Sequence, residues 1–563
     1  MSDSNDTCTY SYEDRPTGEI ISCIHAKWQE DPDGLCIFHS KEIEAKQETF
    51  GKELDAYIQT VKSNEKQDFL CIGFVFPEID FSEQTFNKPA DFTECQFSGY
   101  ANFNSSTFCE EVSFQESQFS KRADFSGSHF NGGTNFRNSR FRGWADFGKT
   151  EYIKFTDFNE SKFSTYADFQ SSHFRENASF RRIQFWGETN FSESKCSNKV
   201  DFGNSRFSGK TDFSISEFSG DTSFRKGHFD ENVRFVSTLF RTKISFIQAK
   251  ITNGEFNNTR FQGNIEFSSV NFMGTNRFEN IRADGTFIFK HNTMEKTTVL
   301  NGCSIALFQY EPSVGEKLIL DCIHYGNNEQ GEKCATRFDF MGQNCSKLMF
   351  LNTNLSKANF LGARIEQTWF ESCSWASAQN GIPYAQVCDH QPQAGKNSQR
   401  LQSLYCQLKK RYEEMKEYSL SGDFHYWEMD LREKSLTWPG HIMEKCLLKL
   451  YRRLGDFGEN YLRLLLWILV PLPAVGLTIF AAEASEINEW LVNTLSGKIP
   501  KFFASYYDHF KQVLLAIVPT AVTNHKILGA LSDFSKLILN MEMIFALIVV
   551  TLFIMAVRRR FRR

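Results

Sequence analysis

The sequence carries little net charge and has no export signal. Its 63 Lys and Arg residues nearly balance 68 Asp and Glu residues, which leaves a formal net charge of −5 over 563 residues. So small a net charge gives no support to a nucleic-acid partner or to an acidic substrate, and neither is expected. The N-terminus, MSDSNDTCTYSYEDRP, lacks a basic start followed by an apolar core, so we predict no secretory signal.

The sequence also lacks a recognisable disulfide framework and the patterns of common enzymes. Its 15 cysteines are an odd number and are scattered through the chain. Without an export signal, most of them are predicted to be reduced thiols. We find no nucleophile beside a base, no glycine-rich loop for phosphate and no metal site with an open position. Catalysis is therefore not expected.

Phenylalanine is the most unusual feature of the composition. The chain has 58 Phe residues, and from Phe92 to Phe147 they recur at alternating spacings of five and six. The pattern is interrupted at Tyr152 and Phe155 and resumes at Phe158, so the repeating unit is eleven residues. A small residue and then Asp or Asn often precede the first Phe of a unit, as in ADF and TNF. This period fits neither a helix nor an alternating strand, and it favours a chain that turns a corner every five or six residues.

This pattern resembles the pentapeptide-repeat family, whose unit is A(D/N)(L/F)XX. The resemblance implies a mainly β fold, a right-handed quadrilateral β-helix in which the central Leu or Phe fills the core. Every second unit here carries one extra residue, so one coil should take about 22 residues. We predict this pentapeptide-repeat solenoid over residues 71–378, followed by a helical hairpin and two transmembrane helices with a re-entrant segment between them.

The predicted solenoid offers few candidates for chemistry. Asp124 with His129, and Asp168 with His173, recur at equivalent outward positions, and we interpret them as a solvated face. The Asp or Asn before each Phe should form local hydrogen bonds rather than a site. Residues 76–290 contain 27 acidic and 26 basic side chains. They therefore lack the strongly acidic surface of those members of the family that imitate DNA.

Three cysteines and a histidine near the N-terminus have the chemistry of metal ligands. Cys36 and His39, in CIFH, can close on one tetrahedral Zn²⁺, and Cys8 and Cys23 complete a set of four. Segment 1–48 is too small for a core of its own, so metal binding could supply its folding free energy. With four protein ligands the Zn²⁺ would be structural. The alternative is a set of unligated thiols.

The pattern becomes helical after the repeats. In LQSLYCQLKKRYEEMKEY the apolar residues fall on one face and the charged residues on the other. The domains predicted beside the zinc module and the solenoid are a linker helix at 49–70, a linker at 379–400, a cytosolic helical hairpin at 401–450 and a two-transmembrane channel-like domain at 451–563.

Two apolar runs near the C-terminus reach membrane length. Residues 464–482 carry no charge, and residues 537–557 contain one ionisable side chain, Glu542. Basic residues flank the outer end of each run, so the positive-inside rule places both termini in the cytosol. The sequence therefore predicts a protein of the inner, cytoplasmic membrane with two spans, for which the lipid bilayer is a partner.

Between these runs, VLLAIVPTAV is an apolar stretch of the length of a re-entrant segment. The layout resembles bacterial proteins in which pentapeptide repeats precede a two-transmembrane, ion-channel-like module. A potassium filter needs glycines that align its carbonyl groups, and no glycine occurs here before Gly529. Potassium selectivity is therefore not supported. The pore candidates are Pro519, Thr520, Thr523, Asn524 and Glu542.

Two functions follow from these features as hypotheses. In the first, a homo-oligomer forms an ion-conducting or membrane-permeabilising pore that is gated by the cytosolic solenoid and zinc module. In the second, the spans are an anchor, and the β-helix is a docking scaffold for an unknown protein partner without conduction. Ion flux from liposomes that contain the protein would distinguish them.

Overall fold

The computed structural model shows a chain that folds into two compact units. One unit comprises Met1–Asn359 with Thr368–Ser374, and the other comprises Phe360–Gln367 with Trp375–Arg563. The residues that the structure describes are 6–14, 18–64, 67–296, 298–312, 318–321, 323, 336–377, 383–388, 398–437, 439–469 and 533–561.

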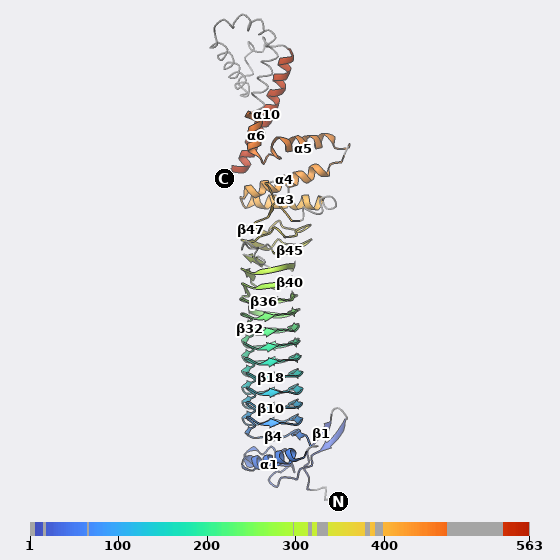
Figure 1. Cartoon of the computed structure of the whole chain (residues 1–563), viewed down its shortest axis with the longest axis vertical. Coiled ribbons are helices and arrows are strands. Elements are labelled where there is room, and N and C mark those ends of the chain that lie inside the picture. Colours follow the sequence, from blue (N-terminus) through green and yellow to red (C-terminus); the bar gives the residue numbers. More distant parts are fainter. Residues whose placement is uncertain are drawn as a thin grey trace. The chain divides into compact units, whose positions relative to one another are not determined.

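The first unit contains a parallel β-solenoid of about 13 turns, as predicted (Figure 1). From β3 (Phe69–Leu70) to β31 (Thr222–Ser223) every strand is two residues long. Each strand pairs in parallel with the strand one coil later, as β12 (Gln118–Phe119) pairs with β16 (Arg140–Phe141) and Phe119 faces Phe141. Because these partners are 22 residues apart, the coil length inferred from the Phe spacing is confirmed.

The core of the solenoid consists of stacked aromatic rings. Phe114 stacks between Phe92 and Phe136, with its ring centroid 4.8 Å from each of theirs. This separation equals the ordinary spacing of hydrogen-bonded strands, so each Phe packs directly on its equivalent in the next coil. Successive coils therefore contribute nearly identical apolar burial.

The interruption inferred at Tyr152 and Phe155 does not exist. The Tyr152 ring is fully buried and stacks between Phe130 and Phe174, at centroid distances of 5.1 and 4.6 Å. Tyr152 thus occupies the Phe position of its unit. The Phe155 side chain is 47% exposed on the surface. The register is therefore continuous through this coil.

Two local features form the corners of the coils: hydrogen bonds from backbone N–H groups to Asp side chains, and residues in the left-handed conformation. The Asp124 carboxylate accepts a hydrogen bond from the Ser126 N–H at 3.0 Å, and the Asp168 carboxylate accepts one from the Gln170 N–H at 2.9 Å. These contacts are the predicted local hydrogen bonds of Asp before Phe. Two residues after the first Phe of a unit, a residue such as Asn138 adopts the left-handed conformation, with φ of 58°. This residue type tolerates that conformation better than most.

The solenoid continues where the sequence pattern is lost. Beyond Lys290 it is formed mostly by longer parallel strands, and residues 324–335 lie outside the described residues. From Arg282 on, its strands are β40 (Arg282–Lys290), β41 (Thr293–Met294), β42 (Thr298–Asn301), β43 (Ser304–Glu311), β44 (Leu318–Asp321), β45 (Arg337–Asp339), β46 (Leu348–Leu351) and β47 (Trp369–Glu371).

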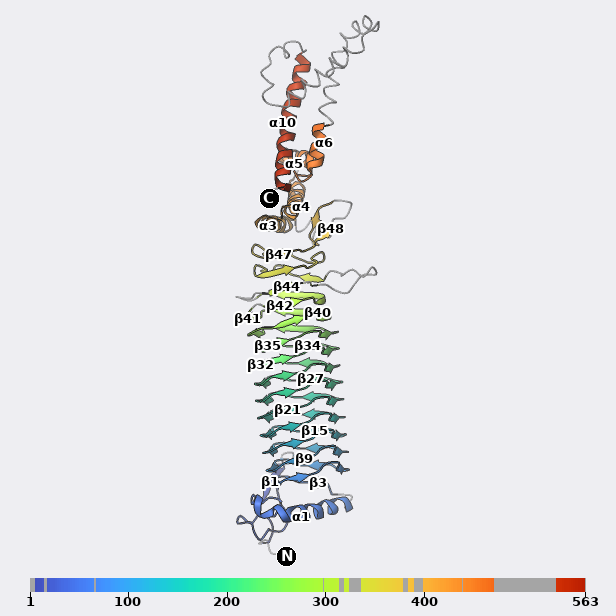
Figure 2. The same ribbon diagram turned by 90° about the vertical axis from the view of Figure 1, so that its left-hand side faces the viewer.

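Helix α1 (Ile43–Ser63) lies across the N-terminal end of the solenoid in both views (Figures 1 and 2). Phe50 packs edge-on against Phe76 of the first coil, with 5.7 Å between ring centroids. At the other end of the helix, Lys88 Nζ donates a hydrogen bond to the Val61 carbonyl at 2.7 Å. The described residues from 6 to 64 are called the N-terminal cap from here on.

Among its described residues, the second unit is mainly helical and contains one short hairpin. Helix α3 (Ser398–Glu414) packs against helix α4 (Tyr418–Ser435), and Tyr412 contacts Phe424 with 5.5 Å between ring centroids. The other elements of this unit are β48 (Ala376–Ser377), β49 (Ala385–Gln386), α5 (Ile442–Gly455), α6 (Tyr461–Leu469) and α10 (Asp533–Phe561).

The prediction of a two-span protein of the inner membrane is wrong. Among the residues that the structure describes, no helix is both long enough and apolar enough to cross a bilayer. The first predicted span, 464–482, lies mostly outside those residues, and the second, 537–557, falls within α10. An apolar run predicts a span only if one continuous helix of sufficient length and hydrophobicity contains it, and no helix in the described ranges meets that condition.

Candidate metal centre

The four predicted metal ligands converge in the N-terminal cap. One ligand atom from each of Cys8, Cys23, Cys36 and His39 lies within 4.8 Å of all the others. The Cys23 and Cys36 sulfurs are 3.9 Å apart, and the Cys8 sulfur is 3.6 Å from His39 Nδ1. Tetrahedral Zn²⁺ with ordinary bond lengths would place such atoms roughly 3.5–3.8 Å apart. The arrangement therefore fits a small tetrahedral cation such as Zn²⁺.

Backbone hydrogen bonds hold these side chains in place. The Cys8 N–H donates to the His25 carbonyl, and the Cys23 N–H donates to the Tyr10 carbonyl, each at 2.9 Å. These bonds fix the two ligands on neighbouring extended segments. The Cys36 N–H donates to the Cys8 sulfur at 3.1 Å, which is a common way to stabilise a metal-bound thiolate.

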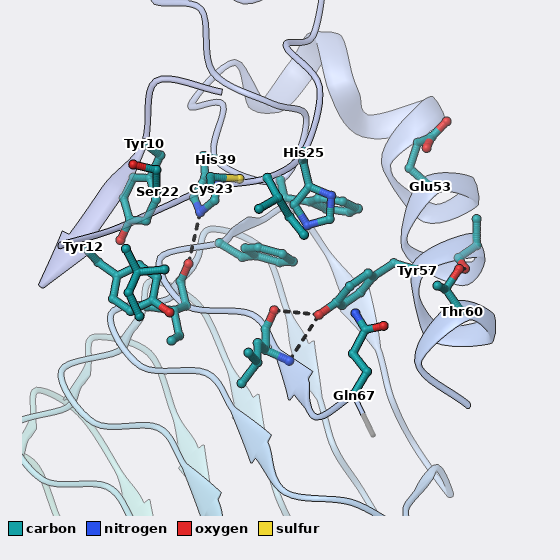
Figure 3. Close-up of a pocket in the computed structure, with 17 residues that line it drawn as sticks. Tyr10, Tyr12, Ser22, Cys23, His25, His39, Glu53, Tyr57, Thr60 and Gln67 are labelled. Atoms are coloured by element: carbon teal, nitrogen blue, oxygen red, sulfur yellow. Dashed lines mark hydrogen bonds between the residues drawn. The ribbon is translucent and has the colours of Figure 1, made fainter. Parts of the chain in front are cut away.

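A turn brings the last two ligands together. The His39 N–H donates to the Cys36 carbonyl at 3.0 Å, and the Cys36 sulfur lies 3.1 Å from His39 Nδ1. The Nε2 atom of the same ring is 3.0 Å from the Ile72 carbonyl of the first coil (Figure 3). Donation from Nε2 to this carbonyl leaves the lone pair of Nδ1 free for a metal. The imidazole also stacks on the Tyr10 ring, with 3.9 Å between centroids.

Without a cation, the surroundings of these thiols favour their protonated form. The hydrogen bond with Cys23 and burial raise the pKa of the Cys36 thiol to about 12. Burial also raises the pKa of Cys8. A bound dication reverses this preference, because its charge stabilises the thiolates and releases their protons.

A buried lysine next to the ligands was not foreseen from the sequence. Lys46 of α1 is fully buried, and its Nζ donates hydrogen bonds to the carbonyls of Ile37, Ser40 and Val75 at 3.1, 2.5 and 2.6 Å. Burial lowers the pKa of Lys46 to about 7, although Cys36 and Asp31 oppose the shift. The ammonium thus joins the helix, the ligand turn and the first coil. No motif marks this residue, since a Lys in IEAKQETF resembles the polar face of any helix.

The comparisons with known proteins concern the solenoid. The family model for pentapeptide repeats (9 copies) matches residues 81–129 and 114–162. These residues are pentapeptide repeats. The match lies in the coils whose Phe rings stack most regularly. The Phe residues of the pentapeptide repeats therefore form the stacked core of these coils. A comparison with curated proteins found no match.

A cavity of about 550 Å³ lies between the cap and the first coil of the pentapeptide-repeat solenoid (Figure 3). Its wall includes five Tyr and Phe side chains and the candidate metal ligands Cys23 and His39. Tyr57 donates a hydrogen bond to the Leu70 carbonyl at 2.8 Å across its floor. Burial lowers the pKa of His25, which also lines the cavity, so this imidazole is neutral at pH 7.

A metal held by these four side chains would have the coordination of a structural site. Three sulfurs and one nitrogen would complete a tetrahedron and leave no position for a water or a substrate. The predicted pore residues are not part of this group of four side chains. Residues 519–524, which include Pro519, Thr520, Thr523 and Asn524, lie outside the described residues, and Glu542 belongs to α10.

Proposed function

We propose that the protein is a non-catalytic docking scaffold. Its pentapeptide-repeat solenoid binds an acidic segment of a partner protein, and a structural Zn²⁺ in the cap closes the end of the solenoid. The observation that carries the proposal is one side of the solenoid on which the described coils from 140 to 186 present cations and no carboxylate. This side, called the cationic face, comprises Arg140, Arg142, Lys162 and Trp186, and it ends at Arg206, which is ion-paired with Asp230 at 2.7 Å.

The cationic face is formed by stacked strands of consecutive coils. Arg140 lies beside Lys162 in the β16–β20 pair, and Gln184 lies between Lys162 and Arg206 in the next two pairs. Arg140 and Arg142 are exposed, and within the described part of the chain neither they nor Lys162 form an ion pair. Since coils are about 4.8 Å apart, these cations form a row of closely spaced charges that favours an extended anion.

The remaining features of this face favour a polypeptide over a nucleic acid. Trp186 is 49% exposed and offers an apolar contact beside the cations, as interface residues often do. The next strands along each coil carry Asp124, Asp146 and Asp168 in adjacent positions. A broad polyanion such as duplex DNA would meet these carboxylates, whereas a narrow acidic segment would avoid them.

Binding of model anions to the full chain tests the scaffold function. A fluorescent oligoglutamate peptide should bind with a salt-dependent affinity, and Arg140→Glu/Arg142→Glu/Lys162→Glu should weaken it by about tenfold or more. The matched control is Arg225→Glu/Lys226→Glu on another side of the solenoid, which should bind as wild type does. Equal binding of oligolysine, or equal loss in the control, would refute the proposal. Tighter binding of a single-stranded oligonucleotide than of oligoglutamate would indicate that the partner is a nucleic acid and not an acidic protein.

Metal analysis tests the Zn²⁺ part separately. The four-ligand geometry and the His39 contact with Ile72 support one Zn²⁺ per chain. Purified full-length protein should contain it, and Co²⁺ in its place should give the absorption of a tetrahedral thiolate site. Protein that folds fully and contains no metal would disprove this part and would leave the docking proposal intact.

A further inference from the structure

Strand β2 (Glu19–Ser22) forms an exposed apolar edge on the cap. It pairs with β1 (Ser11–Asp14) in an antiparallel hairpin, which stands away from the solenoid in Figure 1. Ile20 is 76% exposed, and Ile24, just beyond the strand, is 84% exposed. These two isoleucines lie on the same segment on either side of Ser22, and their exposure marks a candidate interaction site.

The pairing with β1 shows which backbone N–H and C=O groups of β2 point away from β1. The hydrogen bond from the Cys23 N–H to the Tyr10 carbonyl makes these two residues a bonded pair. Bonded and non-bonded pairs alternate along an antiparallel ladder, so the N–H and C=O groups of Ile20 and Ser22 point away from β1. Such an edge is a template for another strand.

The two sides of the hairpin differ in the same alternating way. The cavity wall includes Ile21 and also Ser22 and Ile24, and Cys23 is a candidate metal ligand on the same strand face as Ile21. Side chains alternate between the two faces of a strand. Ile20, Ser22 and Ile24 therefore share the other face, and Ile20 and Ile24 are more exposed than Ile21.

We propose that β2 pairs antiparallel with β2 of a second copy of this chain. Ser22 would face Ser22 of the second copy on a twofold axis, and Ile20 would face Ile24 of the second copy. In this register the outward backbone groups of Ile20 and Ser22 are matched, and both exposed isoleucines of each copy are covered. The two hairpins then form one four-stranded sheet.

Self-complementarity favours a second copy over an unrelated partner. Reversal of the segment from Ile20 to Ile24 places an isoleucine opposite an isoleucine and a serine opposite a serine, without any like charges facing each other. A closed twofold contact of this kind uses the same edge on both copies. A lone two-stranded hairpin is also marginally stable in water, and the added strands correct this.

Charge complementation in the full chain tests the pairing and its register. Wild type should be a dimer by light scattering, whereas Ile20→Lys/Ile24→Lys and Ile20→Glu/Ile24→Glu should each dimerise about tenfold more weakly or worse. An equal mixture of the two variants should restore a heterodimer, because each Lys would then face a Glu. The matched control is Ile215→Lys, which changes an isoleucine of the solenoid that is 64% exposed and should leave the dimer intact.

Three results would overturn the proposal. They are a monomeric wild type, double variants that dimerise as tightly as wild type, and a mixture that remains monomeric. Bound metal in each variant shows that its cap is folded, so a loss of the dimer cannot be ascribed to unfolding. The proposal does not depend on the cationic face, and Arg140→Glu/Arg142→Glu/Lys162→Glu should dimerise normally.

Discussion

The regular coils and the N-terminal cap belong to one compact unit and are stabilised in different ways. In the coils every Phe repeats the contact of its predecessor, as Phe114 does between Phe92 and Phe136. In the cap, the four candidate metal ligands and Lys46 each make a contact that is not repeated along the chain. The loss of one repeated contact leaves its neighbours intact, whereas the loss of a unique contact has no substitute. The cap should therefore fail as a whole and the solenoid only locally.

Removal of the metal should give the largest effect and separate the two regions most clearly. Structural Zn²⁺ typically contributes about 10–16 kcal/mol to small modules, so a chelator or Cys36→Ser should unfold the cap. Hydrogen exchange should show loss of protection in the cap and retained protection in coils 92–246. Cys109→Ser, in the solenoid and away from the ligands, is the control and should change neither. Loss of protection throughout the coils would show that the regions are not independent.

A cavity in the solenoid core should have a smaller and local effect. Phe136→Ala removes a ring stacked 4.7 Å from Phe158 and should cost about 3–5 kcal/mol. Because coils contact only their neighbours, hydrogen exchange should quicken in the adjoining coils while the cap keeps its protection and its metal. The matched change Phe155→Ala, at a side chain that is 47% exposed, should be nearly neutral. Equal costs for the two variants would contradict the stacked core.

Loss of Lys46 tests whether the cap depends on single polar contacts. Lys46→Met leaves three carbonyl groups without their donor and should destabilise the cap by about 3 kcal/mol. Weaker metal retention in a competition with chelator should accompany this loss. Lys52→Met, at an exposed position of the same helix, should have no such effect. If Lys46→Met retained metal as wild type does, the lysine would not support the ligand turn.

The second unit offers a smaller effect that depends on pH. Lys409 Nζ of α3 lies 2.6 Å from the Glu428 carboxylate of α4. Burial raises the pKa of Glu428, but the nearby His425 imidazole, 3.6 Å away, and the hydrogen bond from Lys409 outweigh it and hold the pKa at about 2. The folded state therefore binds fewer protons than the unfolded state between about pH 4.5 and 2. The resulting stability is complete above this window and is lost as the pH falls through it, roughly 2–3 kcal/mol in all.

Unfolding free energies measured across this window check the prediction. Wild type should lose more stability than Glu428→Gln as the pH falls from about 4.5 to 2, because the amide has no proton to take up. This difference between wild type and Glu428→Gln should be the same with and without bound metal. Such a result would show that the stability of the helices does not depend on the cap. Parallel pH profiles for the two proteins would show that the carboxylate is not stabilised in the folded state.

The sequence predicts the repeated parts of the molecule better than the unique ones. The Phe spacing predicts the coil length because one contact is selected again at every turn, and it fails only where Tyr152 was taken for an interruption. The ligand chemistry of Cys36 and His39 is visible in four letters, and the structure brings the predicted partners to them. The role of Lys46 is not visible, because it arises from carbonyls contributed by two other segments, the ligand turn and the first coil. The membrane prediction rested on apolar runs in the sequence, and no helix in the described ranges is both long enough and apolar enough to be a span.

Each coil consists of two units of eleven residues, and this limits how the solenoid can change length. A duplication of 22 residues adds one complete coil, so every later side chain stays on its original side. A duplication of eleven residues adds half a turn and moves every later strand to the opposite side. An insertion of the first kind before Arg140 would preserve the cationic face, and one of the second kind between Arg142 and Lys162 would divide it between two sides. Binding by this surface, as proposed, would therefore restrict variation in length to whole coils.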